Sequence, residues 1–439
     1  MEEIEKNKFK IRKDILIVKV LIIIGLILLL LIPSGFILAL IFERQGLRDS
    51  ALEEVSSKWG KEQNIGGPVL YVKLVKNGPL AADEDTNVKY LKILPSDISI
   101  NGNILPELRY RGIYKFALYS ANLNISGKFE IPDKSDLGYS NWDIVPEESF
   151  VIVGISDMIG IKDSIKLKWN STDSEFYPGV KVNDIFSSGI WTKVVPKAGV
   201  DNLFSFNLNV RGSENIKFLP LGKETNVKID SNWGEPSFVG AFLPVDRSIV
   251  NNKFEAKWKV LDFNRNYSQK WVDADADIGE KINQSAFGLK LLIPVDEYKE
   301  TLRAVKYMIM FVGLTFIVFF FVELLNKKRI HPIQYLLVGF SLIMFYMLLL
   351  SISEHIKFNI AYLLSTITIV LLISTYSYSI LKSKKMALCM AVFLSSLYSF
   401  LYVLLRNQDY SLIIGTLGLF VILSVIMYLT RNIDWYDTK

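Results

Sequence analysis

Apolar residues are concentrated in two parts of the chain, one near the N-terminus and one that fills almost everything after residue 303. The first run extends from Ile15 to Phe42 and is interrupted only by Lys19 and by Pro33-Ser34-Gly35. A membrane-spanning helix needs about 20 apolar residues, and this run is longer. No small-residue cleavage pattern follows it, as one would after a signal peptide. The pattern predicts an uncleaved transmembrane anchor over residues 15–42.

The second apolar region divides into five further spans that together form a bundle over residues 304–430. They are Ala304–Leu325, Ile333–Leu350, Phe358–Leu381, Met386–Leu405 and Ser411–Leu429. Basic residues cluster in segment 1–14, at 327–329 and at 382–385, whereas the alternate loops are poorer in Lys and Arg. The positive-inside rule then makes both termini cytoplasmic, including the tail 431–439, and makes residues 43–303 periplasmic.

The segment 43–303 has the pattern of a folded β-rich domain on a short helical stalk. The stalk is predicted over Glu43–Lys61, and alternation of apolar and polar residues follows Gly66-Gly67-Pro68. Asn101-Gly102 between two short apolar runs predicts a tight hairpin turn. Turn residues at short intervals favour an antiparallel sandwich or curved sheet. The strands we predict include Val69–Lys73, Lys89–Ile93, Tyr114–Tyr119, Phe150–Ile155, Ile165–Trp169, Leu203–Val210, Phe254–Leu261 and Phe287–Ile293.

Composition supports a membrane protein of the α+β class, with six transmembrane helices and a large antiparallel β-rich extracytoplasmic domain inserted between the first and second. Half of the residues are hydrophobic and the mean hydropathy is +0.28. The net charge of +5 is too small to indicate nucleic-acid binding. One cysteine, Cys389, excludes an intramolecular disulfide, and only two histidines are present. These counts argue against a zinc site.

Motifs that would carry catalysis or hold a cofactor are absent from the sequence. There is no P-loop, no G-x-S-x-G elbow and no H-E-x-x-H zinc motif. Asp273, Asp275 and Asp277 alternate, but Ile278 and Gln284 stand where a calcium loop needs Gly and Glu. A solvated acidic loop is the simpler interpretation. We therefore predict no enzyme activity, no catalytic residue, no metal and no cofactor.

Glu354 and His355 form a candidate site at the outer membrane edge. Ser353, Glu354 and His355 are adjacent, so on a helix their side chains point about 100° apart and cannot relay a proton to one another. They end a helix at the lipid headgroups in the simpler interpretation. The alternative is a membrane hydrolase that uses Glu354 and His355.

A polar stripe in the fifth span is a second candidate site. Its spacing of i, i+3, i+4, i+7 and i+11 places Ser395, Tyr398, Ser399, Tyr402 and Arg406 on one helix face. Such hydroxyl-bearing faces most often mediate helix packing. The alternative is the lining of a path for a lipid or small molecule, which would make the chain a transporter.

Four basic residues are candidates for contacts between the outer domain and the membrane. Arg109 and Arg111 flank a predicted strand, and Arg303 and Lys306 lie where the domain passes into the second span. Basic residues at such places anchor a protein at the headgroups. The two charges within or near spans, Lys19 and Glu323, lie close enough to span ends to reach an interface.

Several phrases in a fixed order resemble the CreD family of bacterial inner-membrane proteins, also called cell-envelope integrity proteins. The resemblance covers nearly the whole chain and is densest from Pro294 to Tyr436. The phrases are VSSKWGKEQNIGGPVL at Val55–Leu70, RYRGIYKFALY at Arg109–Tyr119 and PVDEYKETLRAVKY at Pro294–Tyr307, followed by LTFIVFFFVELL, RIHPIQYLLVGFSLIMFYMLLLSISEH, DYSLIIGTLGLF and TRNIDWY.

The resemblance implies a role in cell-envelope integrity and stress tolerance, with links to tolerance of colicins and β-lactams. It implies no established reaction, and so no catalytic residues. The first hypothesis is accordingly a non-enzymatic protein whose periplasmic domain binds or senses an envelope protein or cell-wall component while its helices contact the lipid bilayer. The transporter and the hydrolase remain as alternatives.

Overall fold

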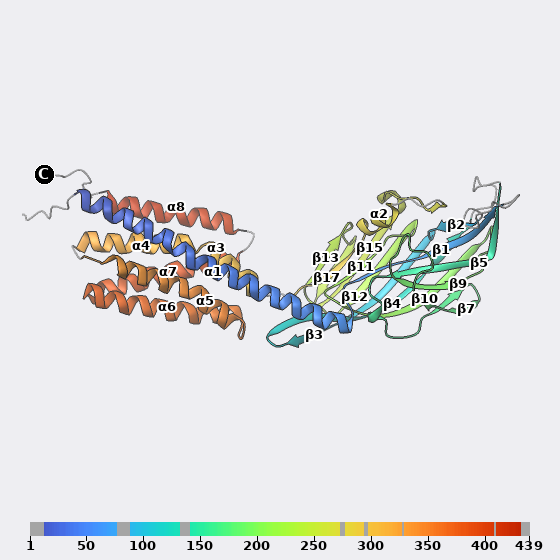
Figure 1. Cartoon of the computed structure of the whole chain (residues 1–439), viewed down its shortest axis with the longest axis horizontal. Helices are drawn as coiled ribbons and strands as arrows, with labels where there is room; N and C mark the ends of the chain where they lie inside the picture. The colour runs from blue at the N-terminus through green and yellow to red at the C-terminus, as the bar shows by residue number, and fades with distance from the viewer. Residues whose placement is uncertain are drawn as a thin grey trace, which may run out of the picture. The chain divides into compact units, whose positions relative to one another are not determined.

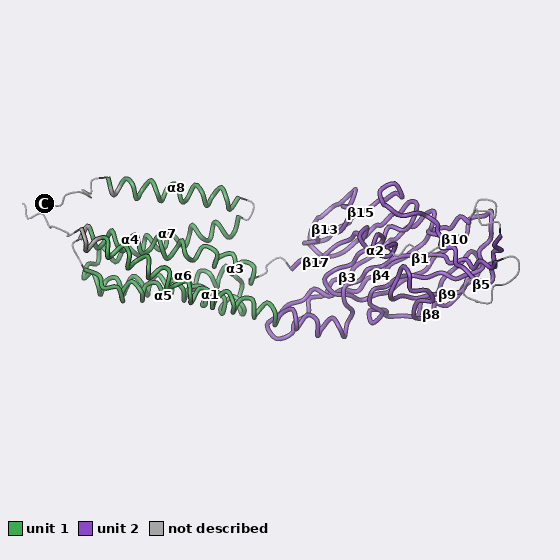
Figure 2. Tube along the Cα trace, turned by 45° about the horizontal axis from the view of Figure 1, so that its top comes forward, with its two compact units in different colours: residues 1–47, 295–439 green, residues 48–294 purple. Residues whose placement is uncertain are grey.

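The computed structural model describes residues 13–76, 88–131, 141–272, 277–293, 297–326, 329–407 and 410–431. The chain forms two compact units (Figure 2), one of residues 1–47 and 295–439 and one of residues 48–294. The second unit is shorter at both ends than the predicted domain 43–303. Several residues used in the predictions lie outside the described ranges, namely those before Lys13, Asp273, Asp275, Lys327, Lys328 and the tail from 432 onward.

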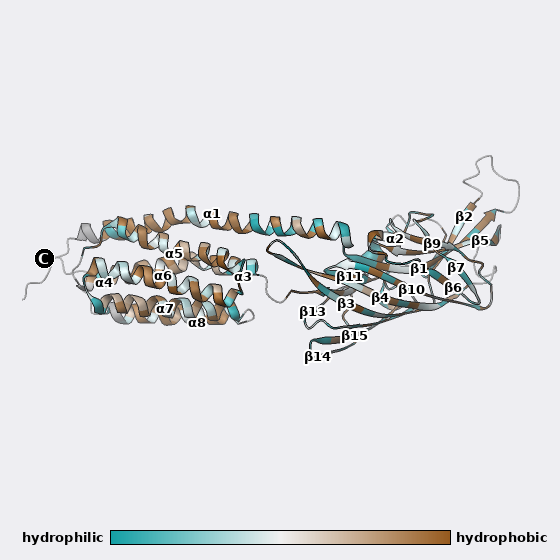
Figure 3. Cartoon of the chain, turned by 90° about the horizontal axis from the view of Figure 1, so that it is seen from below, coloured by the Kyte–Doolittle hydropathy of each residue, from teal (hydrophilic) through white to brown (hydrophobic). Residues whose placement is uncertain are grey.

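Helix α1 (Lys13–Trp59) joins the predicted anchor and stalk into one uninterrupted helix. Pro33 lies inside it, and the Ser34 hydroxyl next to this proline donates to the Leu30 carbonyl at 2.7 Å. Its hydropathy changes along its length from apolar to polar (Figure 3). The helix ends where the amide of Gly60 donates to the Ser56 carbonyl at 2.8 Å.

The first unit also contains six helices from the C-terminal part of the chain (Figure 1), which are α3 (Glu297–Lys306), α4 (Met308–Asn326), α5 (Pro332–Ser353), α6 (Phe358–Leu381), α7 (Lys384–Arg406) and α8 (Ser411–Thr430). Among the described residues, five helices are long and apolar enough to cross a membrane, or six if α3 and α4 form one span. The span predicted at Ala304–Leu325 is interrupted between α3 and α4, whose axes differ in direction by 45°. Helix α3 carries charged residues in its first and last turns, and Tyr298, Thr301, Ala304 and Val305 are buried.

The second unit contains two β-sheets within its described residues (Figure 1). The nine-stranded sheet has the order β13 (Pro236–Gly240), β17 (Phe287–Leu291), β11 (Asn215–Phe218), β1 (Gln63–Lys76), β5 (Trp142–Ile155), β9 (Gly189–Lys193) and β8 (Tyr177–Pro178), with β2 (Val88–Ile93) on β1 and β16 (Lys270–Trp271) on β2. The eight-stranded sheet has the order β14 (Asp246–Val250), β15 (Lys253–Leu261), β12 (Glu224–Ser231), β3 (Asp97–Arg111), β4 (Tyr114–Glu130), β10 (Asp201–Ser213), β6 (Lys166–Trp169) and β7 (Thr172–Glu175).

Both sheets are mixed, whereas the sequence analysis predicted an antiparallel domain. Strand β1 runs parallel to β11, and β12 runs parallel to β3, while the other pairs are antiparallel. Each parallel pair joins strands that are far apart in the sequence, so no local turn signal announces it. The fold is a membrane α+β architecture with two mixed sheets.

Apolar side chains from both sheets form one core between them, which includes Val72 of β1 and Ile100 of β3. A second cluster covers the other face of the nine-stranded sheet, where Ile282 of α2 (Ile278–Gln284) packs near Tyr71 and Phe150. Strand β1 is therefore buried on both faces along most of its length. In contrast, burial alternates residue by residue along β12, as expected for a sheet with one solvated face.

The predicted hairpin at Asn101-Gly102 is wrong. Both residues lie in the middle of β3, where Asn101 pairs with Asn124 and Gly102 with Leu123. The hairpin turns at Gly112, which has a φ of +60°. Gly102 serves packing instead, since a Cβ there would lie 2.6 Å from Leu123 Cδ2 and 2.8 Å from Ile229 Cδ1.

Replacing Gly102 by Val is expected to destabilise the domain, because the added methyl groups overpack the space beside Leu123 and Ile229. Overpacking of this kind costs about 1–3 kcal/mol. Asn101→Val is the matched control, because the neighbouring side chain is exposed and valine favours strands. Thermal unfolding followed by tryptophan fluorescence measures both variants, and equal midpoints would contradict the packing role of Gly102.

Candidate functional site

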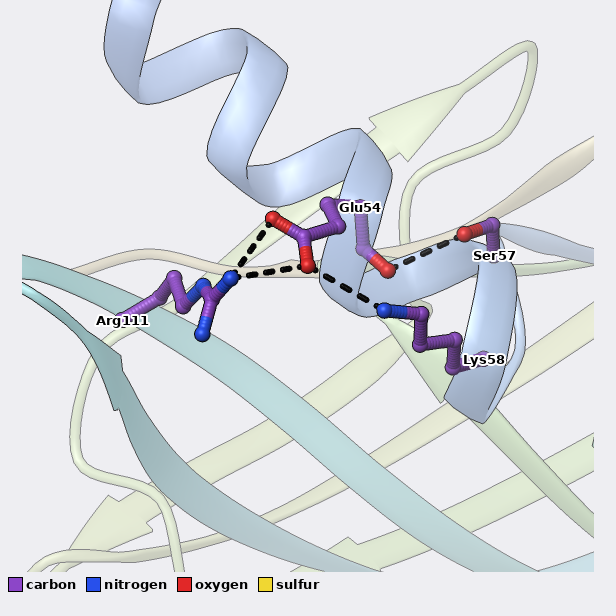
Figure 4. Close-up of polar contacts among 4 residues, drawn as sticks. All are labelled: Glu54, Ser57, Lys58 and Arg111. Carbon is purple, nitrogen blue, oxygen red and sulfur yellow. Dashed lines mark hydrogen bonds and ion pairs between the residues drawn. The ribbon is translucent and has the colours of Figure 1, made fainter.

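The end of α1 is held on the β3–β4 hairpin by a group of polar contacts within the second unit (Figure 4). Arg111 Nη2 donates to both carboxylate oxygens of Glu54, at 2.9 and 3.1 Å, and Lys58 Nζ lies 3.1 Å from Glu54 Oε1. Both carboxylate oxygens therefore share one guanidinium nitrogen, and hydrogen bonds between two charged groups are stronger than those between neutral groups. We call Glu54, Trp59, Arg109, Arg111 and Arg211 the α1 clamp.

Trp59, the last residue of α1, occupies the centre of the α1 clamp. The guanidinium carbon of Arg211 lies 4.4 Å from the centre of its ring and that of Arg109 lies 5.5 Å away. Its indole N–H also donates to the Tyr119 carbonyl at 3.4 Å. Cations over an indole face are attracted by its quadrupole, by about 0.5–1 kcal/mol when exposed and more when desolvated.

Buried hydrogen bonds fix the chain where it passes from α1 into β1. The side-chain amide of Gln63, which is fully buried, donates to the carbonyls of Asp157 at 2.9 Å and of Arg211 at 3.0 Å. The Lys61 amide donates to Asp157 Oδ2 at 2.6 Å. The junction is therefore ordered on both sides of the helix end.

Arg109 and Arg111 were predicted as contacts between the domain and the membrane. In the structure both guanidinium groups are engaged with α1, Arg109 with Trp59 and Arg111 with Glu54. Their contacts with Glu54 and Trp59, which precede them by about fifty residues, were not predicted from the sequence, and the proposed contact with the membrane stays a prediction. The other two candidates lie in the first unit, where Arg303 Nη2 donates to the Leu404 carbonyl at 3.4 Å and Lys306 is exposed.

At the predicted outer-edge site, Glu354 and His355 have different surroundings. The Glu354 side chain is 10 % exposed, accepts from the Tyr298 hydroxyl at 3.0 Å and lies 3.7 Å from Arg44 Nε. His355 is exposed. Glu354 thereby joins α3, α5 and α1, which is a structural role.

The five residues of the predicted polar face do not share one environment. Tyr398 is buried, Tyr402 is half-buried, and Ser395, Ser399 and Arg406 are exposed. Leucines supply most of the rest of the buried face of α7, so the serines point away from the bundle. Aromatic residues pack around Tyr398 in the bundle. The centres of the Phe345 and Tyr398 rings are 4.5 Å apart, and the Tyr362 hydroxyl donates to the Tyr398 carbonyl at 2.6 Å.

Lys19 and Glu323 pair with each other inside the first unit rather than reaching separate interfaces. Lys19 Nζ of α1 contacts Glu323 Oε1 of α4. Glu323 also accepts from the Tyr335 hydroxyl and from the Ile330 amide, each at 3.0 Å. Two lone, opposite charges near the same predicted membrane face were the signal for this pair, and the sequence analysis treated them separately.

Among the described residues, no group of three His, Cys, Asp or Glu side chains is placed to hold a metal ion.

Comparison with known proteins identifies the family of the chain. A family model described as inner membrane protein CreD matches residues 15–436. The chain belongs to the CreD family. Inner membrane protein CreD of Escherichia coli strain K12 is 31 % identical over 423 residues, which cover 94 % of this chain and 92 % of the relative.

Membership in the CreD family makes the chain a membrane-spanning inner-membrane protein. The name of the relative states a location and no reaction. Three of the five residues of the α1 clamp lie in phrases that carry the resemblance, Trp59 in Val55–Leu70 and Arg109 and Arg111 in Arg109–Tyr119.

Replacing Glu323 by Gln is expected to destabilise the helical unit, because Lys19 then keeps a partly buried charge without a counterion. Breaking a buried ion pair from one side costs about 3–5 kcal/mol, and the partial exposure of Lys19 favours the lower value. Thermal unfolding followed by circular dichroism measures the loss.

The double variant Lys19→Met/Glu323→Gln is the control for this prediction. Because it removes both charges and keeps an acceptor for Tyr335, it should recover most of the lost stability. A single variant as stable as the parent chain would show that the two charges do not depend on each other.

Proposed function

We propose that the protein is a non-enzymatic component of the bacterial inner membrane that supports cell-envelope integrity and stress tolerance. Residues 48–294 act in the periplasm as a binding or sensing module for an envelope protein or cell-wall component. The helices anchor this module in the lipid bilayer. The observation that carries the proposal is the α1 clamp, which fastens a large folded domain to the helix that continues into the membrane unit.

The chemistry of the clamp suits a mechanical link rather than a reaction. Several of its polar groups are already engaged, as the hydrogen bonds from Arg111 Nη2 to both Glu54 oxygens and from the Trp59 N–H to the Tyr119 carbonyl illustrate. A catalytic site instead needs a nucleophile or base directed at an open substrate position. Because the clamp holds the helix end at two arginines and a buried amide, a displacement of β3 or β10 on binding would move the end of α1.

The packing of the helical unit supports this function over transport. Where a transport path along α7 would pass Tyr398, the rings of Phe311 and Phe345 pack against its ring and the Tyr362 hydroxyl donates to its carbonyl. Glu354, the acid of the hydrolase alternative, is committed to Tyr298 and Arg44. Neither alternative gains a specific site from these contacts.

A charge-reversal series tests whether the clamp is needed for function. Arg111→Glu and Glu54→Arg each place like charges together, and the double variant restores an opposite pair, all in a Lys58→Met background that removes the second partner of Glu54. We expect each single variant to lower the tolerance of cells to a β-lactam and the double variant to recover it. Exposed ion pairs contribute only about 0–1 kcal/mol to stability, so protein levels should stay equal on an immunoblot. Full tolerance in both single variants would refute the proposed link.

Cysteine labelling tests the proposed orientation. In a Cys389→Ser background, Phe263→Cys places a thiol at a side chain that is 90 % exposed in the second unit. A membrane-impermeant maleimide added to spheroplasts should label it. Lys385→Cys, in the basic 382–385 segment, should react only after the membrane is opened. The opposite labelling order would place residues 48–294 in the cytoplasm.

A further inference from the structure

The outward face of the eight-stranded sheet carries a regular array of uncharged polar side chains on three adjacent strands, β3, β4 and β10. In register across these strands, Asn103, Asn122 and Asn209 form one row, Asn101, Asn124 and Asn207 a second, and Ser99, Ser126 and Ser205 a third. We call these nine positions the amide grid. Rows on one strand are spaced by about 6.8 Å and neighbouring strands by about 4.8 Å.

The composition of the amide grid is not explained by folding. Asparagine is depleted in strands, so local structure gains nothing from six asparagines in the middle of three of them. Charges return on the adjacent strand β12, where Lys228 pairs with Asn101 and Asp230 with Asn103. Residues that oppose the local structural preference in this way are expected at functional sites.

Most of the grid amides are available to a ligand. Asn101, Asn103, Asn122, Asn124 and Asn207 are exposed. Asn209 donates to Asp163 Oδ2 at 2.9 Å and Asn101 to Ser99 Oγ at 3.5 Å. The other four side-chain amides bond to no residue that the structure describes. Each amide offers two N–H donors and one acceptor oxygen.

A groove of about 370 Å³ begins at one edge of the grid and shares Asn103 with it. Polar groups of Asn232 and Ser248 line it together with the apolar side chains of Leu105 and Val250, which are 57 % and 60 % exposed. Ser231 also lines the groove, is 6 % exposed, and its hydroxyl has no hydrogen-bond partner among the described residues. Its side chain lies on the core face of β12 with those of Val227 and Ile229, so it contributes no contact to a ligand on the grid.

Among the charged residues that line the groove, Glu255 is paired within the protein, whereas Lys253 is exposed and takes part in no ion pair with a described residue. Glu255 lies 2.9 Å from Lys257 Nζ and 3.1 Å from Lys228 Nζ, and these lysines lower the pKa of Glu255 to about 2. Asp230, opposite Glu255 in the sheet, has its pKa raised by burial and by the Glu255 carboxylate. The groove thus carries one exposed lysine, one paired carboxylate and Asp230 beside a neutral grid, not the cluster of like charges that would select a metal ion or a charged polymer.

We propose that the amide grid and the adjoining groove bind an uncharged glycan chain that is rich in hydroxyl and acetamido groups. The inference rests on the proposed function and names the ligand of its periplasmic module. Side-chain amides and serine hydroxyls both donate and accept, as sugar hydroxyls do, and Leu105 and Val250 can cover the apolar face of a sugar ring. An extended peptide would instead add to a sheet edge through its backbone. Repeated rows on a flat face suit a ligand with a repeating unit.

Binding of N-acetylglucosamine oligomers to the full chain in phospholipid nanodiscs tests the proposal. Sugar-based detergents are avoided because their headgroups would compete. We expect calorimetry to detect the hexamer, and the dimer to bind more weakly because it reaches fewer rows. Asn122→Val/Asn124→Val should weaken hexamer binding by about ten-fold or more, since two amide contacts are lost.

Controls separate loss of binding from loss of fold. Valine favours strands, so the double variant should keep its unfolding midpoint. Glu130→Thr, exposed on the same strand β4 but beyond the grid, should bind as the parent chain does. Mass photometry of the same samples reports whether the grid instead joins two copies of the chain.

Three outcomes would overturn the assignment: no hexamer binding by the parent chain, equal binding by Asn122→Val/Asn124→Val, or a change of oligomeric state alone in that variant. None of them depends on the charge-reversal series in cells. If that series behaves as expected while the glycan fails to bind, the ligand class is wrong and the proposed module function stands.

Discussion

Helix α1 must stay one continuous helix through two different surroundings although Pro33 removes one backbone donor, and the organisation of the chain depends on this. In hydrocarbon no water replaces a lost backbone bond, so the apolar part of the helix stays helical through Pro33. Beyond Phe42 the same helix becomes charged, and its side chains pair with the β-rich unit instead. Because Trp59 ends the helix between Arg109 and Arg211, β1 starts from a fixed position. A flexible linker at this point would remove that position.

Much of the fold was predictable because single segments carry their own signals. The alternation of apolar and polar residues along Leu203–Val210, which matches the alternating burial of β10, and the apolar length of Phe358–Leu381 are properties of local sequence. Pairing between distant segments was not predictable in the same way, as the parallel pairs β1–β11 and β12–β3 show. The hairpin turn predicted at Asn101-Gly102 was wrong for a related reason. Its turn chemistry was sound, but tertiary packing against Leu123 and Ile229 required a residue without a side chain.

Of the five residues of the α1 clamp, only Arg109 and Arg111 were candidates from the sequence, and they were candidates for contact with the membrane. Arg109 and Arg111 stood out because they flank a strand, yet only the fold brings Glu54 and Trp59 to them. On α7 the helical period correctly grouped Ser395 and Ser399, but period alone does not say which face meets neighbouring helices. Most leucines of α7 lie on the face that packs against neighbouring helices. Tyr398 is buried with them, and both serines are exposed. To predict the ion pair between Lys19 and Glu323, one would have to infer the membrane depth of both residues, which lie on two separate helices.

One hairpin connects the clamp and the amide grid, and this gives the proposed binding a physical route to α1. Strands β3 and β4 pair without interruption from Asp97–Lys128 to Arg111–Tyr114. Asn101, Asn103, Arg109 and Arg111 occupy alternate positions of β3, so they lie on the same face of that ladder. A ligand changes an equilibrium only by its difference in affinity for two states. A glycan that fits the grid at one twist of this hairpin better than at another would therefore favour one position of Arg109 and Arg111, and the Glu54 and Trp59 contacts would pass that preference to α1.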